Sequence, residues 1–445
     1  MSAQCQSKEQ VLEQAHQAGV RFVMLQLTDI LGVIKNVAIP VERLREALEA
    51  GIMFDGSSIE GFVRIEESDM FLRPDPDTFA VYPWTSGECT TARLICDVYN
   101  PDGTAFDGCP RGALKKVMKE ARSLGYELLA APEPEFFLFN LDEHGRPTLD
   151  TTDQASYFDL SPTDRGEEAR RDIMMALKKM NFDVETSHHE VGPGQHEVDF
   201  HYTDALTTAD NVATFRFVVR FIARQHNLHA TFMPKPVYGI AGSGMHVHQS
   251  LHQNGRNVFF DPNERYGLSK VCLHYIGGLL RHARGLTAIC NPLVNSYKRL
   301  VPGFEAPVYI AWSERNRSPL IRIPSPRGEN TRIEMRSPDP SCNPYLAMAV
   351  MQKSGLDGIK NRIMPPEPVN MNIYAMSPRE RQRHKIDKLP GSLDEALDAL
   401  RADYLVQEAL GDHILNRFLE AKQIEWERYS TQVHDWEREQ YLAVF

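Results

Sequence analysis

The chain has 445 residues, of which 42% are hydrophobic and 24% are charged. This composition is typical of a folded protein and excludes a disordered, collagenous or coiled-coil chain. Acidic residues outnumber lysine and arginine by 60 to 49, which gives a formal net charge of −11 without a block of like charge. The balance gives no support to binding of nucleic acid or of an anionic membrane. At about 150 residues per domain, the length predicts two or three domains.

The seven cysteines are scattered and form no C-x-x-C pair. This pattern favours free thiols in a reducing compartment over disulfides or a zinc–thiolate site. The start of the sequence has no basic stretch leading into an apolar one. No window approaches the roughly 18 uninterrupted apolar residues of a membrane span. We therefore expect a cytoplasmic protein.

The first hundred residues show helix and hairpin signals. Ser7 and Gln10 form a capping box for a first helix, and a second amphipathic helix begins after Pro40. Between them, two β-rich runs at 21–28 and 32–39 predict a hairpin. The front of the chain therefore has an α+β character.

A stretch rich in Pro, Gly and Asp at 100–112 is the best candidate domain boundary. It predicts a small N-terminal domain of sheet and helices, 1–105, and a larger domain, 106–445. In the larger domain, helical patterns alternate with strand-like runs, which favours a mixed antiparallel sheet packed by helices. The tail from Ser392 onward is predicted to be helical, beginning with a capping box completed by Glu395. The predicted fold class is α+β.

Glu133 and Glu135 stand two residues apart in a strand-like run, so both side chains point to the same side. The apolar run 136–139 that follows predicts a strand entering the core. Paired carboxylates there need a cation to offset their repulsion and desolvation. A solvated edge strand is the alternative, and this run alone does not decide between the two.

Glycine and proline at 192–194 separate two acidic strand ends, which predicts a hairpin in which Glu190 and Glu197 face each other. Histidines 188, 189 and 196 suggest zinc when they are taken alone. However, the H-E-x-x-H signature is absent, and the Gly-Pro-Gly centre forbids a helix.

Two further strand-like runs carry ionisable side chains on one face. Arg332, Glu334 and Arg336 alternate with aliphatic residues, and a surface ion-pair ladder is the alternative interpretation. His246 and His248 share one face just after a glycine-rich segment. A lone histidine of this kind is more often a core or surface residue.

Together these runs would supply carboxylate oxygens with one or two imidazoles, which suits magnesium or manganese with bound phosphates better than structural zinc. Spacing alone does not show that they converge. Arginines in the loop-like segments 295–307 and 316–322 suit carboxylates and phosphates, although a solubilising surface is the alternative. Acidic residues that bind metal ions and arginines that bind phosphate, in one cavity, would together support phosphoryl transfer.

Six motifs occur in order, namely 54–58 (FDGSS), 132–137, 188–197, 242–246, 295–307 and 316–319. Together they resemble class I glutamine synthetase in its shorter bacterial and archaeal form, over essentially the whole chain. The resemblance implies a β-grasp-like N-terminal domain and a catalytic domain whose curved antiparallel sheet forms a funnel. It also implies a homo-oligomer, a dodecamer of two hexameric rings with each active site between neighbouring subunits.

The resemblance implies two or three Mg²⁺ ions, or Mn²⁺, at each site and ATP as co-substrate. One ion would bind Glu135, Glu190 and Glu197, and a second would bind Glu133, His246 and Glu334. The implied nucleotide site consists of Glu185, Tyr202, His248, Ser250, Arg317, Arg322 and Arg332.

The same resemblance assigns the other substrates. Glutamate and the transferred phosphate would be held by Arg299, Arg317, Arg336 and the backbone of Gly242, with Glu305 on a closing flap. The ammonium pocket would consist of Asp55 and Ser58 of the adjacent subunit with Tyr157 and Glu190. Asp55, Glu305 and Arg317 would take part in catalysis. The implied reaction joins ammonium to L-glutamate through γ-glutamyl phosphate, with ATP as the phosphoryl donor.

Some positions depart from the family pattern. Ala241 stands where many members have asparagine, and the run 154–159 has Ala-Ser where Gly-Gly is common. The segment 386–391 lacks the adenylylated tyrosine loop of the longer form. Arg64 matches a feedback-sensing position of the shorter form.

Three other functions share some of these features. A γ-glutamyl-amine ligase shares the fold, but Asp55 and Tyr157 favour ammonium because a carboxylate and a phenol suit a compact cation. A non-catalytic relative would have lost metal or arginine positions, and none is lost here. A phosphagen kinase has an acid-lined funnel without these six motifs.

Overall fold

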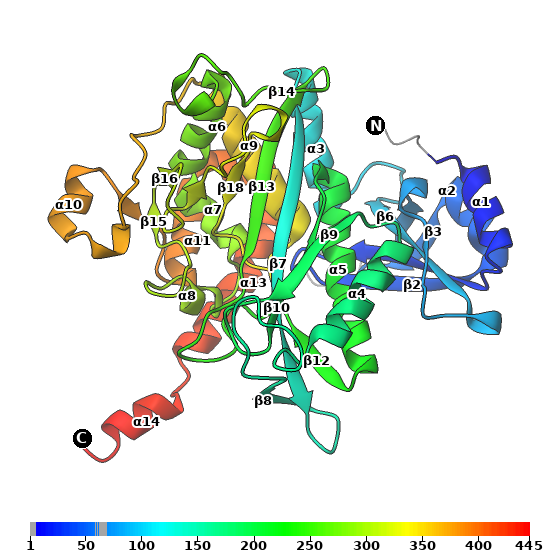
Figure 1. Ribbon diagram of the computed structural model, residues 1–445. Helices are drawn as coiled ribbons and strands as arrows, with labels where there is room; N and C mark the ends of the chain where they lie inside the picture. Colours follow the sequence, from blue (N-terminus) through cyan, green and yellow to red (C-terminus); the bar gives the residue numbers. More distant parts are fainter. Residues whose placement is uncertain (1–5, 58, 60, 62–68) are drawn as a thin grey trace.

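The computed structural model describes residues 6–57, 59, 61 and 69–445, arranged as two large β-sheets and one small one with helices around them (Figure 1). The expectations for Ser58 and Arg64 fall outside these residues. Among the described residues, none of the helices combines the length and apolar character needed to cross a membrane. The six described cysteines are free thiols, as expected.

The N-terminal sheet has the strand order β2-β1-β6-β4-β3, with β5 paired to β6. Its strands are β1 (Phe22–Thr28), β2 (Ile34–Pro40), β3 (Ile52–Asp55), β4 (Asp69–Pro74), β5 (Ala80–Val81) and β6 (Thr91–Tyr99). Strands β1 and β2 form the predicted hairpin. Helix α1 (Lys8–Gln17) begins with the predicted capping box at Ser7, and α2 (Leu44–Ala50) buries Leu44 and Leu48.

The larger sheet has the order β16-β17-β18-β13-β7-β10-β9, with four short strands paired to β7 or β13. Its strands are β7 (Glu127–Leu141), β8 (Pro147–Thr151), β9 (Val184–His189), β10 (Gln195–Phe200), β11 (Thr203–Asp204), β12 (Leu228–Thr231), β13 (Met245–Gln253), β14 (Arg256–Asn257), β16 (Trp312–Ser313), β17 (Ile321–Arg322) and β18 (Ile333–Met335). All of these pairs are antiparallel except β16–β17. The predicted mixed antiparallel sheet is confirmed.

Strand β7 runs through the middle of this sheet, and its apolar segment lies in the core. Phe136 and Phe137 are fully buried, so the solvated-edge alternative for the Glu133 run is wrong. Helix α5 packs against β7 and β12, and α4 packs against α5. In Figure 1, α4 and α5 lie between the large sheet and the N-terminal elements.

Helices make up much of the remaining chain. Those after α2 are α3 (Pro110–Ser123), α4 (Glu167–Lys179), α5 (Ala205–Gln225), α6 (Lys270–Arg281), α7 (Ala283–Cys290), α8 (Ser296–Arg299), α9 (Pro344–Lys360), α10 (Pro378–Arg383), α11 (Leu393–Ala402), α12 (Tyr404–Leu410), α13 (Asp412–Ser430) and α14 (Asp435–Tyr441). A small sheet pairs β15 (Tyr309–Ile310) with β19 (Asp387–Lys388). The tail is helical as predicted, and α14 projects away from the rest (Figure 1).

The capping box expected at Ser392 is only half formed. The Ser392 hydroxyl accepts from the Glu395 backbone N–H, but the Glu395 carboxylate accepts from the N–H of Gly391 instead of Ser392. The Glu395 carboxylate therefore binds the backbone N–H one residue before the N-cap, and the reciprocal bond of a capping box is missing.

A buried guanidinium joins the N-terminal sheet to the large domain. Arg111, at the start of α3, donates to Asp75 and Asp97 at 2.7 and 3.0 Å, and to both carboxylate oxygens of Asp210 on α5. Tyr345 of α9 also donates to Asp210, at 2.7 Å. Because each carboxylate has a cationic partner, the cost of burying these charges is offset, and the network fixes the N-terminal sheet against α5.

Candidate functional site

The strand pairing brings four acid-bearing runs to one region of the large sheet. Strand β13 lies between β7 and β18, while β10 pairs with the other edge of β7. In this register Glu133 lies opposite His246, and Glu135 lies opposite Glu197. His248 lies opposite Glu334. The runs that sequence spacing could not place together therefore converge.

Glu133, His246 and Glu334 form one compact group, with one ligand atom of each within 4.8 Å of the others. His246 Nδ1 lies 3.3 Å from Glu133 Oε2 and 3.7 Å from Glu334 Oε1. Arg322 and Arg336 both donate to the Glu334 carboxylate. Glu334 is fully buried and Arg336 is 3% exposed, so the surface ion-pair ladder is wrong.

Glu135, Glu190 and Glu197 lie on β7 and on the two sides of the β9–β10 hairpin. The hairpin is as predicted, but its register differs, because Glu197 pairs with His188 and Glu190 follows the end of β9. The Glu190 N–H donates to the Gln195 carbonyl at 2.7 Å. His188 bridges the two acids, with Nε2 3.1 Å from Glu197 Oε1 and Nδ1 3.6 Å from Glu190 Oε1.

The electrostatics of this second group call for a cation. Burial raises the pKa of Glu135 well above its usual range, and the neighbouring Glu190 and Glu197 raise it further. Burial, together with Asp199, likewise raises the pKa of Glu197 well above normal. Buried carboxylates that repel one another offer hard oxygen ligands, which is the donor set that Mg²⁺ and Mn²⁺ prefer. The residues therefore fit such ions.

The surroundings of His246 favour its neutral form, which can act as a metal ligand. Burial and the nearby Arg336 guanidinium lower its pKa to about 4. An imidazole coordinates a metal only in its neutral form. The neutral imidazole of His246 can therefore bind a cation together with the carboxylates of Glu133 and Glu334, because it carries no positive charge that would repel the ion.

These shifts predict a pH-dependent response to metal. Because the pKa values of Glu135 and Glu197 are raised on folding, and that of Asp199 is raised to about 6, these three carboxyl groups bind more protons in the metal-free fold than in the unfolded chain. The contribution of these groups to the free energy of unfolding therefore falls as the pH rises from the ordinary carboxyl range through their raised values. Mg²⁺ needs the deprotonated carboxylates, so its stabilising effect grows over the same window.

The measurement is the thermal midpoint with MgCl₂ and with EDTA, at a pH of about 5.5 and of about 8. We expect the larger difference in thermal midpoint at the higher pH. At a metal concentration about 100 times its Kd, metal binding there should add about 2.7 kcal/mol to the free energy of unfolding. An equal difference at both values would contradict the assignment of these acids to a metal.

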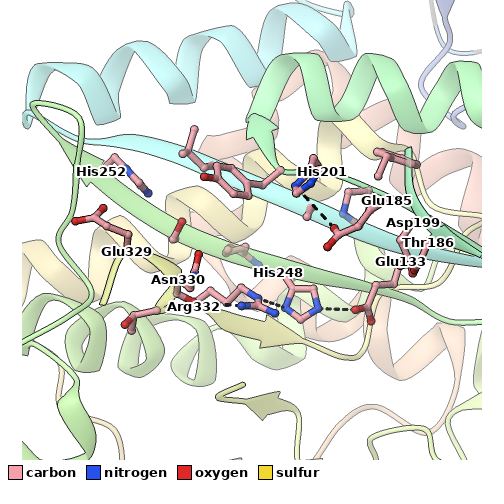
Figure 2. Close-up of a pocket in the computed structure, with 18 residues that line it drawn as sticks. Glu133, Glu185, Thr186, Asp199, His201, His248, His252, Glu329, Asn330 and Arg332 are labelled. Atoms are coloured by element: carbon pink, nitrogen blue, oxygen red, sulfur yellow. Dashed lines mark hydrogen bonds and ion pairs between the residues drawn. The ribbon is translucent and has the colours of Figure 1, made fainter. Parts of the chain in front are cut away.

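A cavity of about 340 Å³ adjoins Glu133 (Figure 2). A chain of hydrogen bonds crosses it: Arg332 Nε donates to His248 Nδ1 at 3.2 Å, and His248 Nε2 lies 2.6 Å from Glu133 Oε1. Five of the residues expected at the nucleotide site line this cavity, namely Glu185, Tyr202, His248, Ser250 and Arg332. Arg317 and Arg322 are not among the lining residues, and Arg322 contacts Glu334 instead.

The expected substrate arginines fall into two places. Arg299 and Arg336 are buried next to each other, because Arg299 Nη2 donates to the Arg336 carbonyl at 3.1 Å. Gly242 packs on the Arg299 stem, and a Cβ there would come within 2.4 Å of the Pro234 carbonyl oxygen. Arg317 is exposed and hydrogen-bonds the Tyr157 side chain.

The Tyr157 ring lies beside the acids of the hairpin. It stacks edge-on against His188 at 5.4 Å between ring centroids. Burial raises the pKa of Tyr157, and the charge of Glu190 raises it further. Tyr157 therefore lies close to Glu190, with which it was grouped in the expected ammonium pocket, and also close to Arg317.

Asp55 belongs to the N-terminal sheet, which lies on the other side of α4 and α5 from the large sheet (Figure 1). It ends β3 in the N-terminal sheet, and its exposed carboxylate accepts from the backbone N–H and hydroxyl of Ser57, at 2.8 and 2.7 Å. These local hydrogen bonds lower its pKa. The carboxylate is therefore held ionised on a surface of the N-terminal sheet.

Two residues of the site were missed by the sequence analysis. Gln195 Nε2 donates to Glu135 Oε2 at 2.9 Å and to the Gly242 carbonyl at 3.2 Å, and no spacing rule indicates this link. Asp199 groups with His188 and Glu197. Its position two residues after Glu197 on the same strand was a signal that could have found it.

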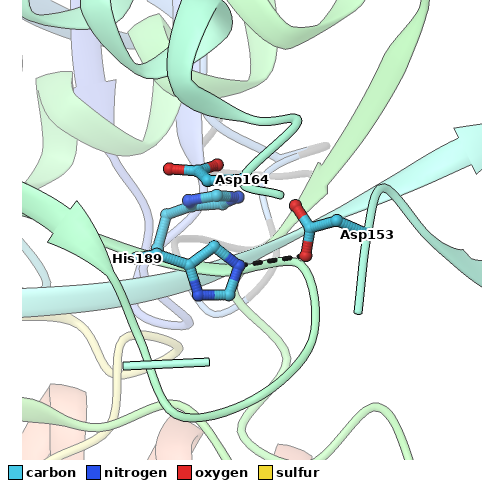
Figure 3. A group of neighbouring side chains, drawn as sticks. Asp153, Asp164 and His189 are labelled. Carbon is cyan, nitrogen blue, oxygen red and sulfur yellow. Dashed lines mark hydrogen bonds and ion pairs between the residues drawn. The ribbon is translucent and has the colours of Figure 1, made fainter. Parts of the chain in front are cut away.

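A second buried cluster contains Asp153, Asp164, His189 and His196 (Figure 3). Arg170 Nη1 lies 2.8 Å from Asp164 Oδ2 and 2.9 Å from His196 Nδ1. His189 contacts Asp153 at 3.0 Å and the Glu190 carbonyl at 2.7 Å. Arg170 offsets the charge of Asp164, and Asp153 accepts from the backbone N–H of Gly194 at 2.9 Å, so the cluster supports the hairpin turn next to Glu190.

Comparisons with known proteins agree with this geometry. Residues 19–101 match the glutamine synthetase beta-Grasp domain, and residues 107–441 match the glutamine synthetase catalytic domain. A glutamine synthetase of Staphylococcus aureus (strain N315) is 58% identical over 440 residues, covering 99% of both chains. One of Thermus thermophilus is 57% identical over 443 residues, again covering 99% of both.

Solved structures show the same fold over nearly the whole chain. A GmaS/ADP complex superposes with a TM-score of 0.89 at 32% identity and covers 97% of this chain and 99% of its own. GmaS without ligand gives a TM-score of 0.87 at 33% identity, with the same coverage. The chain therefore belongs to the glutamine synthetase family and is an ATP-dependent ligase that joins ammonium to L-glutamate.

Proposed function

We propose that the two acid groups of the sheet hold two or three Mg²⁺ ions between the ATP phosphates and glutamate. One group is Glu135, Glu190 and Glu197, and the other is Glu133, His246 and Glu334. The observation that carries the proposal is a set of buried, mutually repelling carboxylates next to Glu133, which itself lines the cavity. When bound, the ions would neutralise the phosphate charge during phosphoryl transfer.

The protein side chains position the reactants for the first step. The γ-phosphoryl group of ATP passes to the γ-carboxylate of glutamate, which gives ADP and an acyl phosphate. Arg299 and Arg336 provide guanidinium groups for the carboxylates and the transferred phosphate. The hydrogen bonds that link Arg332, His248 and Glu133 fix the positions of these side chains in the wall of the cavity where the nucleotide binds.

In the second step ammonium loses a proton, ammonia attacks the γ-carbonyl carbon, and inorganic phosphate leaves with glutamine as the product. Tyr157 and Glu190 form the part of the ammonium pocket that this chain supplies. Asp55 takes part as the residue that attracts ammonium and helps to remove its proton. Glu305 closes over the γ-carboxylate, and Arg317 stabilises the developing phosphate charge.

We further propose that Asp55 comes from a neighbouring subunit of a dodecamer of two hexameric rings. The support is the position of Asp55 on the N-terminal sheet, held by Ser57 and apart from the acids of its own chain. A head-to-tail ring contact would place it at the next subunit's site. Light scattering should then report a mass close to twelve chains.

The alternative weighed from the sequence, a γ-glutamyl-amine ligase, shares the fold and the phosphorylation of glutamate, so one assay separates the two activities. The deciding assay follows phosphate release from ATP and Mg²⁺ with glutamate, and compares ammonium, ethanolamine, putrescine and no amine. Release that requires both glutamate and ammonium supports glutamine synthesis. Release with a larger amine but not with ammonium would assign the amine ligase, and no turnover by a folded oligomer would favour a non-catalytic relative.

A further inference from the structure

Lys235 is a buried lysine that joins two loops of the site. Its backbone N–H donates to Asn295 Oδ1 at 2.7 Å, and Asn295 Nδ2 donates back to the Lys235 carbonyl at 3.0 Å. Its ammonium group donates to the Ile240 carbonyl, just before Gly242. Lys235 therefore ties the Gly242 loop to the segment that leads into α8 and Arg299.

The Lys235 ammonium also contacts a third segment, because Nζ lies 3.8 Å from the centroid of the Phe304 ring. Lys235 is only 8% exposed. Among the described residues, no carboxylate acts on the Lys235 ammonium, and the one charged neighbour that does is the Arg299 guanidinium. Burying an unpaired ammonium is costly, and the face of an aromatic ring is one of the few groups that offset this cost. The contact is therefore more than incidental packing.

Phe304 belongs to the loop at 301–307 that carries Glu305. Glu305 has a φ of 57°, in the left-handed region that non-glycine residues seldom adopt. The backbone of this loop is held by Arg336, whose Nη2 lies 3.4 Å from the Glu305 carbonyl, and by Tyr374, whose hydroxyl lies 2.5 Å from the Ala306 carbonyl. A strained conformation persists only where surrounding contacts impose it.

We propose that Lys235 is a positioning residue whose ammonium, seated on the Phe304 ring, keeps the 301–307 loop closed over the reacting γ-carboxylate. The inference rests on the proposed role of Glu305 in that loop. Its chemical consequence is protection of the acyl phosphate from water. When the loop opens, a water oxygen attacks the γ-carbonyl carbon, phosphate leaves, and glutamate is regenerated, so that ATP is consumed without glutamine.

The test measures phosphate and glutamine in the same reaction with ATP, Mg²⁺, glutamate and ammonium. The wild-type ratio of the two products should be close to one. Phe304→Leu keeps an apolar side chain without the ring, and Lys235→Met keeps the stem without the charge. We expect each to raise the phosphate-to-glutamine ratio about tenfold. Phe304→Tyr and Lys235→Arg retain a ring and a cation, and should keep the ratio close to that of the wild type.

The double variant Lys235→Met with Phe304→Leu separates this contact from two independent packing defects. Because both changes remove the same contact, its ratio should match that of either single variant. Hydrogen exchange of the loop amides should also be faster in Phe304→Leu than in the wild type. An unchanged ratio in both single variants, or a multiplied effect in the double variant, would overturn the proposal. A wild-type protein that makes no glutamine would instead overturn the proposed function.

Discussion

Replacing Glu197 with glutamine is expected to lower the rate of glutamine synthesis about 1,000-fold, which corresponds to about 4 kcal/mol of lost transition-state stabilisation. Glu197 is 6% exposed and lies opposite Glu135 across β7 and β10. The amide has the same size but lacks the charge that would hold a cation. Loss of a metal therefore removes charge neutralisation from the phosphoryl-transfer step.

The same substitution should stabilise the metal-free protein. Glu135, Glu190 and Asp199 repel a charged Glu197 in a buried setting, so a neutral amide relieves the repulsion. We expect an increase of about 1 kcal/mol in the free energy of unfolding in EDTA, and loss of the further stabilisation by Mg²⁺. A substitution that lowers activity but raises stability shows that the Glu197 carboxylate serves catalysis and not the stability of the fold.

Urea unfolding with EDTA and with MgCl₂, beside a steady-state assay, gives both quantities. Glu168→Gln on the exposed face of α4 removes the same charge outside the site, so it should change neither by much. A Glu197→Gln protein that is destabilised in EDTA and still responds to Mg²⁺ would show that this carboxylate holds the fold and not a metal.

Local alternation in the sequence was enough to predict which side chains share a strand face. Glu133 with Glu135, and His246 with His248, follow directly from the two-residue period of an extended chain. The first helix and the first hairpin also follow from local signals, because a capping box and a turn lie within a few residues of the elements they define. These predictions required no knowledge of distant contacts.

The convergence of the runs could not be obtained in this way. Glu133 and His246 are 113 residues apart and meet only because β13 pairs with β7. The link from Gln195 to Glu135 spans 60 residues, and that from His189 to Asp153 spans 36. Such contacts depend on strand order and loop packing, which no local pattern encodes. Resemblance to a family supplied the grouping of the acids. It did not indicate that Gln195 and Asp199 belong to the site, or that the Lys235 ammonium contacts the Phe304 ring.

Asp55→Ala is expected to lower glutamine synthesis about 100-fold at limiting ammonium, although the side chain lies on a sheet remote in topology from the acids. Its carboxylate is exposed and is held by Ser57 in an ionised form. Alanine keeps the strand position and removes only the anion. The effect should therefore appear in the dependence on ammonium, with little change in thermal stability.

Co-expression of Asp55→Ala with Glu197→Gln tests where this anion acts. If a site takes its acids from one chain and Asp55 from the next, mixed rings contain sites with both groups intact. Random mixing of equal amounts restores about a quarter of the sites. Each variant expressed alone and purified identically is the matched control. Mixed oligomers no more active than the two controls would place Asp55 at the site of its own chain or outside catalysis. Recovered activity requires that the N-terminal sheet of one subunit completes the reaction chamber of its neighbour.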